Sequence, residues 1–404
     1  MANALLTIDM ITNEAVRLWK NSNLFIQNID VQYDDQFAVA GAKIGDTLRI
    51  RLPNDYVLRT GAAASVQDTA EQSTTMTVAT QQGVDMSFTS KDLTMSLDDF
   101  SRRILAPAVN TTAGGVALSI MAGADGGVSN YVANTDGSGN IIAPTIDTVL
   151  QARAILAENS APGMARKFVL GPRSMAHATS TLAGLFNPSQ AIGEQYRSGE
   201  VKNALGFDWY EDQTVLAHTT ASYSGSLTVN GAGQSGTAIT VNAITGGLAQ
   251  GDIITFAGVY AVNRITKQTT GQLRQFAVTA AVPSGGTTIN VYPALVPANN
   301  GNAVQYQTVT ASPANSAAIV VASASGAIYR KNIAYVPEAI TMATADLVMP
   351  PNVEASRKVY DGVSMRMIRQ YAIGTDQLIT RMDVLYGFKY VRPEWCVVVA
   401  DTPN

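Results

Sequence analysis

The sequence of 404 residues predicts an α+β fold that carries an all-β insertion. Apolar residues recur at helical spacing in separate stretches, and a helix, a strand, a turn and a second helix follow one another between residues 145 and 182. Between residues 223 and 312, by contrast, nearly every apolar cluster is short and β-branched, and helical periodicity is absent. These patterns place the insertion inside a mixed host domain.

The first predicted element is an amphipathic helix near the N-terminus. Its apolar stripe consists of Leu5, Ile8, Ile11, Ala15, Leu18 and Trp19. The next segment, residues 21–36, is polar and irregular and supplies no obvious partner for this stripe. We interpret the helix as an arm that lies on the body of the protein or on a neighbouring chain. An ordinary helix packed on its own domain is the alternative, and the periodicity leaves it open.

Two extended segments follow, at residues 47–52 and 74–80, separated by a stretch rich in Ala, Gly, Gln and Thr. Long loops of this kind inside compact domains are uncommon and usually functional. A strand pair with polar faces and few charges suits lateral pairing with another chain. A disordered loop is the alternative.

A long helix is predicted over residues 96–127. Ser96 and Asp99 have the spacing of a capping box, and apolar residues follow at helical intervals. Pro107 predicts a kink, because an interior proline removes a hydrogen bond and clashes with the preceding turn.

The next elements form an α+β layer: a helix at 145–158, a strand at 167–170, a turn at Gly171-Pro172, a helix at 174–182 and a strand at 205–210. The short strands of residues 223–312 are separated by Gly, Asn and Pro turns, which predicts a small barrel or sandwich. The mixed pattern returns after Ser312, and strands are predicted at 364–371 and 378–388.

Composition favours a subunit of an assembly. The chain is 46% hydrophobic but only 14% charged, against roughly 25% charged residues in average soluble domains. Surfaces with so few charges suit a protein whose faces are covered by neighbours, although a sparingly soluble monomer would look the same. The net charge is −4, from 27 basic and 31 acidic residues. It provides no basic field for sequence-specific DNA binding.

The sequence shows no sign of disulfide bonding, export or membrane insertion. The single cysteine, Cys396, allows no internal disulfide and lies in an apolar run, so a buried inert thiol is expected. The N-terminal residues lack a basic region and a long apolar core, and the chain has no run of about 18 apolar residues. We therefore expect a protein made and kept in the cytoplasm, with no membrane partner.

Patterns that carry chemistry elsewhere have simpler explanations here. Residues 231–236 fit GxGxxG, but β-type residues follow them, so a hairpin turn is expected rather than a nucleotide site. His177 and His218 lack ligand partners at zinc spacing, and no GxSxG elbow is present. The basic pairs Arg102-Arg103 and Arg330-Lys331 suit salt bridges between subunits or weak contacts to DNA. No cofactor, metal or catalytic residue is predicted.

Two motifs carry a resemblance to a known family. The first is GDIITFAGV, residues 251–259, and the second combines Tyr386-Gly387 with Arg392-Pro393-Glu394 near the C-terminus. In this order they resemble the coat proteins of short-tailed phages of the Salmonella phage P22 type.

The resemblance implies the Hong Kong 97-type capsid fold. Its expected parts are an N-terminal arm (1–36), an extended loop with peripheral-domain strands (37–95), a spine helix (96–127), an α+β core (128–222), an inserted β-barrel (223–312) and a closing segment that completes both domains (313–404). The loop would reach over an adjacent subunit.

It also implies a major capsid protein with no enzymatic activity, located in the virion and assembled in the host cytoplasm. Hexamers and pentamers of the chain would build an icosahedral shell, first as a procapsid that later expands. The expected partners are further copies of the chain, a scaffolding protein, a portal protein and weakly held double-stranded DNA. The candidate assembly contacts are Ile11, Glu14, Trp19, Arg59, Arg102, Arg103, Arg392 and Glu394.

Two other classes of function stay open at this point. A β-rich binding or surface module would explain the insertion, but it predicts an export signal that the sequence lacks. An enzyme with a β accessory domain would explain the mixed first half, yet it predicts a polar constellation that is not found.

Overall fold

The computed structural model describes residues 7–33, 47–58, 61–62, 66, 72–89, 101–182, 201–298, 304–374 and 377–402. The chain forms two compact units and passes between them several times. Unit 1 comprises Met1–Ile50, Ser73–Ile120 and Ile340–Val391, and unit 2 comprises Arg51–Gln72, Met121–Ala339 and Arg392–Asn404.

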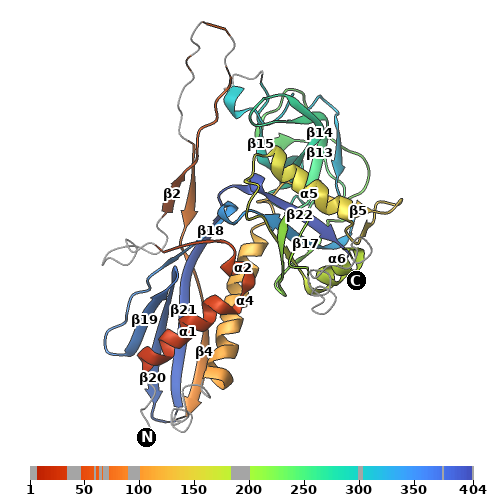
Figure 1. Cartoon of the computed structure of the whole chain (residues 1–404). Coiled ribbons are helices and arrows are strands. Elements are labelled where there is room, and N and C mark those ends of the chain that lie inside the picture. The colour runs from red at the N-terminus through yellow and green to blue at the C-terminus, as the bar shows by residue number, and fades with distance from the viewer. Residues whose placement is uncertain are drawn as a thin grey trace. The chain divides into compact units, whose positions relative to one another are not determined.

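A twisted sheet forms the centre of unit 1 (Figure 1). Its described strands are β1 (Asp30–Tyr33), β4 (Thr80–Thr89), β18 (Ile340–Ala345), β19 (Glu354–Tyr360), β20 (Val363–Ala372) and β21 (Gln377–Tyr390). The long strand β21 pairs with β4 along one edge, and with β20 and then β18 along the other. The strands predicted at 364–371 and 378–388 are confirmed as β20 and β21.

The N-terminal helix α1 (Ile8–Ser22) packs on β19 and β20. Thr7 caps its first turn, and Asp9 and Lys20 complement the helix dipole at the two ends. The short helix α2 (Leu24–Gln27) follows. The predicted apolar stripe is real, but it is buried within its own chain: Ile11 is 2% exposed and Trp19 is 0% exposed. Within one chain the helix packs on its own unit, as the alternative of an ordinary helix predicts, and its buried stripe is not left for a neighbouring chain.

The predicted spine helix is described from Ser101 onward. Its described part consists of a π-helical turn, Ser101–Leu105, followed by α4 (Ala106–Ala122). The π-helical turn lies just ahead of Pro107, the residue at which the sequence predicts a kink. Among the described residues, the helix Ser101–Ala122 is long and apolar enough to cross a membrane, and half of its most apolar stretch is buried inside the chain.

A two-stranded hairpin of β2 (Thr47–Arg51) and β3 (Ser73–Thr77) packs on β18 and β21. The hairpin approaches so closely that a Cβ at Gly387 would lie 2.2 Å from the carbonyl oxygen of Thr77. Only glycine fits there. This explains the glycine of the Tyr386-Gly387 motif.

Unit 2 contains a mixed sheet in the order β6-β5-β22-β17-β7-β9-β8, with β10 also paired to β17. The bounds are β5 (Tyr131–Thr135), β6 (Ile141–Ile142), β7 (Lys167–Leu170), β8 (Asn203–Ala204), β9 (Phe207–Glu211), β10 (Ala217–Thr219), β17 (Ile328–Tyr335) and β22 (Cys396–Asp401). The helices α5 (Ile146–Glu158) and α6 (Pro172–Leu182) match the predicted helices. Short helical turns lie at η5 (Pro337–Ala339) and η6 (Pro393–Trp395).

The insertion in unit 2 is a closed six-stranded antiparallel barrel in the order β11-β16-β13-β14-β15-β12. The strands are β11 (Leu227–Thr228), β12 (Gly236–Thr240), β13 (Ile253–Val262), β14 (Thr269–Val278), β15 (Thr288–Leu295) and β16 (Ala318–Val321), with a helical turn η4 (Val304–Tyr306) before β16. Hydrogen bonds from Asn242 N to Thr228 O (2.9 Å) and from Asn230 N to Thr240 O (3.1 Å) join β12 to β11 and close the barrel.

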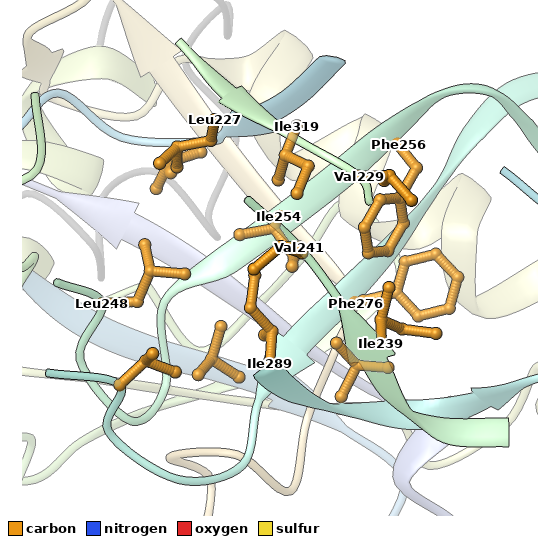
Figure 2. Close-up of a cluster of buried hydrophobic side chains, with 14 of the residues drawn as sticks. Leu227, Val229, Ile239, Val241, Leu248, Ile254, Phe256, Phe276, Ile289 and Ile319 are labelled. Carbon is orange, nitrogen blue, oxygen red and sulfur yellow. The ribbon is translucent and has the colours of Figure 1, made fainter. Parts of the chain in front are cut away.

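Aliphatic side chains and two phenylalanines fill the barrel (Figure 2). The Phe256 and Phe276 rings meet edge to face, with centroids 5.3 Å apart. One predicted boundary is wrong: β16 begins after Ser312, yet it pairs with both β11 and β13. The insertion therefore runs to at least Val321.

Candidate functional site

The barrel joins its host sheet through two adjacent strands. The chain enters after β10 and leaves into β17, and these two strands pair with each other. Thr220 N donates to Ala327 O (2.9 Å), and the hydroxyl groups of Thr220 and Ser323 are 2.6 Å apart. The entry and the exit of the insertion thus lie side by side.

A buried polar cluster fixes this junction, and it contains the Gly251-Asp252 motif. The Asp252 carboxylate is fully buried, bonds His218 Nε2 (2.9 Å) and accepts from Ala249 N (2.7 Å). Gly251 has φ 90°, and a Cβ there would lie 2.8 Å from Asp125 Oδ1. The glycine of the motif is therefore needed for backbone conformation and space: it lets the turn pass close to the side chains of Asp125 and Lys331.

Two further groups complete the cluster. Lys331 forms an ion pair with Asp125, and the His218 ring packs on Tyr329 with centroids 5.2 Å apart. Burial raises the pKa of Tyr329. Lys331, which the sequence suggested as a contact to DNA or to another subunit, is instead used inside unit 2. The described residues contain no group of three or more His, Cys, Asp or Glu side chains that could hold a metal.

A second cluster brings together three segments that are distant in the sequence. Arg264, which follows β13, donates from Nε to both Asp55 carboxylate oxygens at 3.0 Å and from Nη1 to Glu394 Oε1 at 2.6 Å. Burial alone would lower the pKa of Arg264, but the hydrogen bonds and charges of Asp55 and Glu394 raise it overall. The guanidinium thus remains charged at any physiological pH.

The Arg392-Pro393-Glu394 motif belongs to this cluster. The Arg392 guanidinium lies over the Trp395 ring at 4.7 Å and reaches Glu394 Oε1 at 3.4 Å. Trp395 Nε1 donates to Asn159 O at 3.1 Å. A groove of about 250 Å³ runs beside these residues and the segment from Pro53 to Tyr56. The motif therefore joins the closing strand, α5 and the barrel.

A larger cleft of about 690 Å³ lies between β14 and the α5–β5 layer. Gln275 spans it by exchanging hydrogen bonds with the backbone of Tyr131, at 2.7 and 2.8 Å. Arg274 lines the same cleft, and burial lowers its pKa, with Tyr292 and Glu394 opposing the shift. Its Nε has no hydrogen-bond partner among the described residues.

The predicted contact residues fall in different places. Arg392 and Glu394 lie in the Arg264 cluster, whereas Arg102 and Arg103 are exposed at the start of the π-helical turn. Glu14 pairs with Arg17 (2.8 Å) and accepts from Ser101 (3.3 Å), and Arg59 lies outside the described residues. Ile11 and Trp19 belong to α1 and are buried on its inner face. Sequence reasoning missed Arg264 and Asp55, whose separation of 209 residues leaves no local signal.

A family model described as "P22 coat protein - gene protein 5" matches residues 39–399, which is most of the chain. The chain belongs to the P22 coat protein family. This coat protein is a structural, non-enzymatic component of the virion and forms the icosahedral shell of a tailed phage. The predicted family, location and structural role are confirmed. The enzyme and surface-module alternatives are excluded.

Solved phage structures are also similar to the coat protein. One from Mycobacterium phage Che8 is 12% identical and covers 93% of this chain and 90% of that chain, with a TM-score of 0.45. The capsid structure of cyanophage P-SCSP1u is 9% identical and covers 95% and 89%, with a TM-score of 0.45. The CUS-3 coat protein I-domain is 34% identical and covers 24% of this chain and 96% of that chain, with a TM-score of 0.20. No curated protein sequence matches the chain.

Proposed function

We propose that this coat protein has the Hong Kong 97-type arrangement. Unit 1 would be the peripheral domain, with α4 as its spine helix, and the mixed sheet of unit 2 would be the axial domain. Residues 51–72 would form the extended loop, and the barrel would be the inserted domain. The order of the elements along the chain supports this assignment, because α4 precedes the mixed sheet and the strands β18–β21 return to unit 1.

We also propose that hexamers and pentamers of the protein form the shell. They assemble with a scaffolding protein, and around a portal, into a procapsid that expands when double-stranded DNA is packaged. Standard protein interfaces bury roughly 1,600 Å². Several such interfaces on each subunit would make a stable closed shell from modest pairwise affinities.

This proposal rests on the exposed apolar side chains of residues 51–72, here called the extended segment. Leu52 N donates to Gln72 O at 2.8 Å, which closes the base of the segment. Beyond that base, Leu58 is 90% exposed and Val66 is 95% exposed. Apolar side chains that the subunit leaves in water are suited to burial against a second copy. DNA contact is expected to be weak, since the net charge is −4 and the exposed Arg102-Arg103 pair is isolated.

Deletion of residues 57–71 tests the proposal. The wild-type protein mixed with its scaffolding protein should give closed shells by electron microscopy and light scattering. The deletion variant should unfold at the same urea concentration as the wild type but form no shells, because the segment contributes to contacts between copies and not to a subunit core. Shells of normal size from the deletion variant would overturn the role of the loop. Failure of the wild type to form shells would overturn the assembly scheme.

A further inference from the structure

The Arg264 cluster places the barrel in contact with the base of the extended segment. Asp55 lies three residues beyond Leu52, where the segment begins, and Arg264 lies in the connection between β13 and β14. Both residues belong to unit 2. The contact therefore links the insertion to the part of the chain that carries the exposed apolar side chains.

The geometry of this contact restrains the orientation of the Asp55 side chain as well as its distance from Arg264. One guanidinium nitrogen engages both oxygens of Asp55 at 3.0 Å, while another nitrogen of the same plane engages Glu394 at 2.6 Å. A planar donor held at two positions by carboxylates has little freedom to rotate. Glu394 lies in η6, which leads directly into strand β22 of the mixed sheet. Asp55 is thus held to the sheet of unit 2 through Arg264.

Another cation of the same connection is already engaged elsewhere. Lys267 donates from Nζ to Gln305 O at 2.6 Å, and burial lowers its pKa although Asp55 opposes the shift. A lysine would also lack the planar fork that joins two carboxylates. Arg264 is therefore the residue of this connection that fixes Asp55.

We propose that Arg264 is a positioning residue for shell assembly. By fixing Asp55, it sets the direction in which the extended segment continues beyond Asp55, and so where Tyr56 and Leu58 meet a second copy of the chain. This inference rests on the proposed function, in which the segment contacts a neighbour. In this proposal the barrel also has a role in assembly, because its residue Arg264 holds the extended segment in the orientation that contacts a second copy.

The test compares Arg264→Gln, Asp55→Asn and the double variant in the full-length protein. Arg381→Gln is the matched control, because Arg381 also forms an ion pair, with Asp383, but lies in unit 1. Hydrogen–deuterium exchange of residues 52–58 in the unassembled subunit reports on the segment directly. Assembly with the scaffolding protein, followed by light scattering and electron microscopy, reports on the consequence.

Either single variant should speed exchange of residues 52–58 about tenfold or more and slow assembly, with an unchanged thermal transition of the barrel. The double variant should be no worse than either single variant, since both remove one shared contact. The control should behave as the wild type does. Wild-type exchange or wild-type assembly in Arg264→Gln would overturn the inference. If the wild type itself forms no shells, the proposed function fails, and the exchange data alone decide whether Arg264 holds the segment.

Discussion

Ending the inserted barrel at Ser312 should leave it unable to fold, because strand β16 lies beyond that residue. We compare two isolated fragments, residues 223–312 and residues 217–330. The shorter fragment has the boundary suggested by composition. The longer one retains β16, the paired entry and exit strands, and the bond between His218 and Asp252.

The cost of losing β16 can be worked from its contacts. Ile319 and Val321 are buried in the barrel core, and burial of one aliphatic side chain is worth roughly 1.5–3 kcal/mol. Together they contribute roughly 3–6 kcal/mol. The strand also pairs with β11 and β13, and each lost ladder hydrogen bond costs roughly 0.5–1.5 kcal/mol. Small domains are stable by only about 5–15 kcal/mol, so the loss removes most or all of the barrel's stability.

Far-UV circular dichroism during heating and two-dimensional amide NMR spectra are the assays. The longer fragment should give dispersed β-type shifts and one cooperative transition. The shorter one should give collapsed shifts and no transition. Within the longer fragment, Ile319→Ala should lower the transition temperature, whereas Val320→Ala, at a position that is 57% exposed on the same strand, should have little effect.

A shorter fragment that melts cooperatively at the temperature of the longer one would refute this reasoning. It would mean that β11 and β13 find other partners and that closure by β16 contributes little. Disorder in both fragments would instead show that the barrel requires the host sheet.

Other outcomes are expected in the full-length protein. Ile11→Asp should lower the free energy of unfolding of the isolated subunit by about 3 kcal/mol or more, because it places a carboxylate in a buried stripe; an unchanged urea midpoint would contradict the packing of α1. Asp252→Ala should cost roughly 2–4 kcal/mol in the same assay, since buried donors lose their acceptor. Burial alone would raise the pKa of Asp383, but hydrogen bonds from Arg366 and Arg381 lower it below its ordinary value of 3.8. Stability from this depressed pKa is present above the unfolded value and is lost as the pH falls through the folded one, so urea titrations should show a loss below about pH 4 that Asp383→Asn diminishes.

Local signals predicted the elements well. Helix α5 spans Ile146–Glu158, one residue shorter than the predicted helix at 145–158, and β7 has the predicted bounds. The boundary at Ser312 failed for a local reason too: it was placed where the mixed pattern returns, but the stretch that follows contains a turn of the barrel, with Ser316 at φ 61° and its N donating to Val229 O at 2.9 Å. Turn chemistry alone does not distinguish a turn within a domain from a junction between domains.

Long-range pairings lay beyond such signals. The apolar stripe of α1 had no partner nearby in the sequence, because its partners β19 and β20 follow more than 300 residues later. The Arg264 cluster likewise joins side chains 209 and 130 residues apart. Of its members, only Arg392 and Glu394 were candidates, and they were identified through the family resemblance. Periodicity reports which face of an element is apolar, but not which segment covers it.

Closure of the barrel also matters for a protein that exists in many crowded copies. Each of the six barrel strands has a neighbour on both sides, since Thr228 and Asn230 bond across to β12. An open sheet would instead present a free strand edge, on which a strand of another molecule could add. Subunits held side by side at high local concentration would be especially prone to such growth. The two hydrogen bonds that complete the ring thus protect the protein from aggregation through this domain.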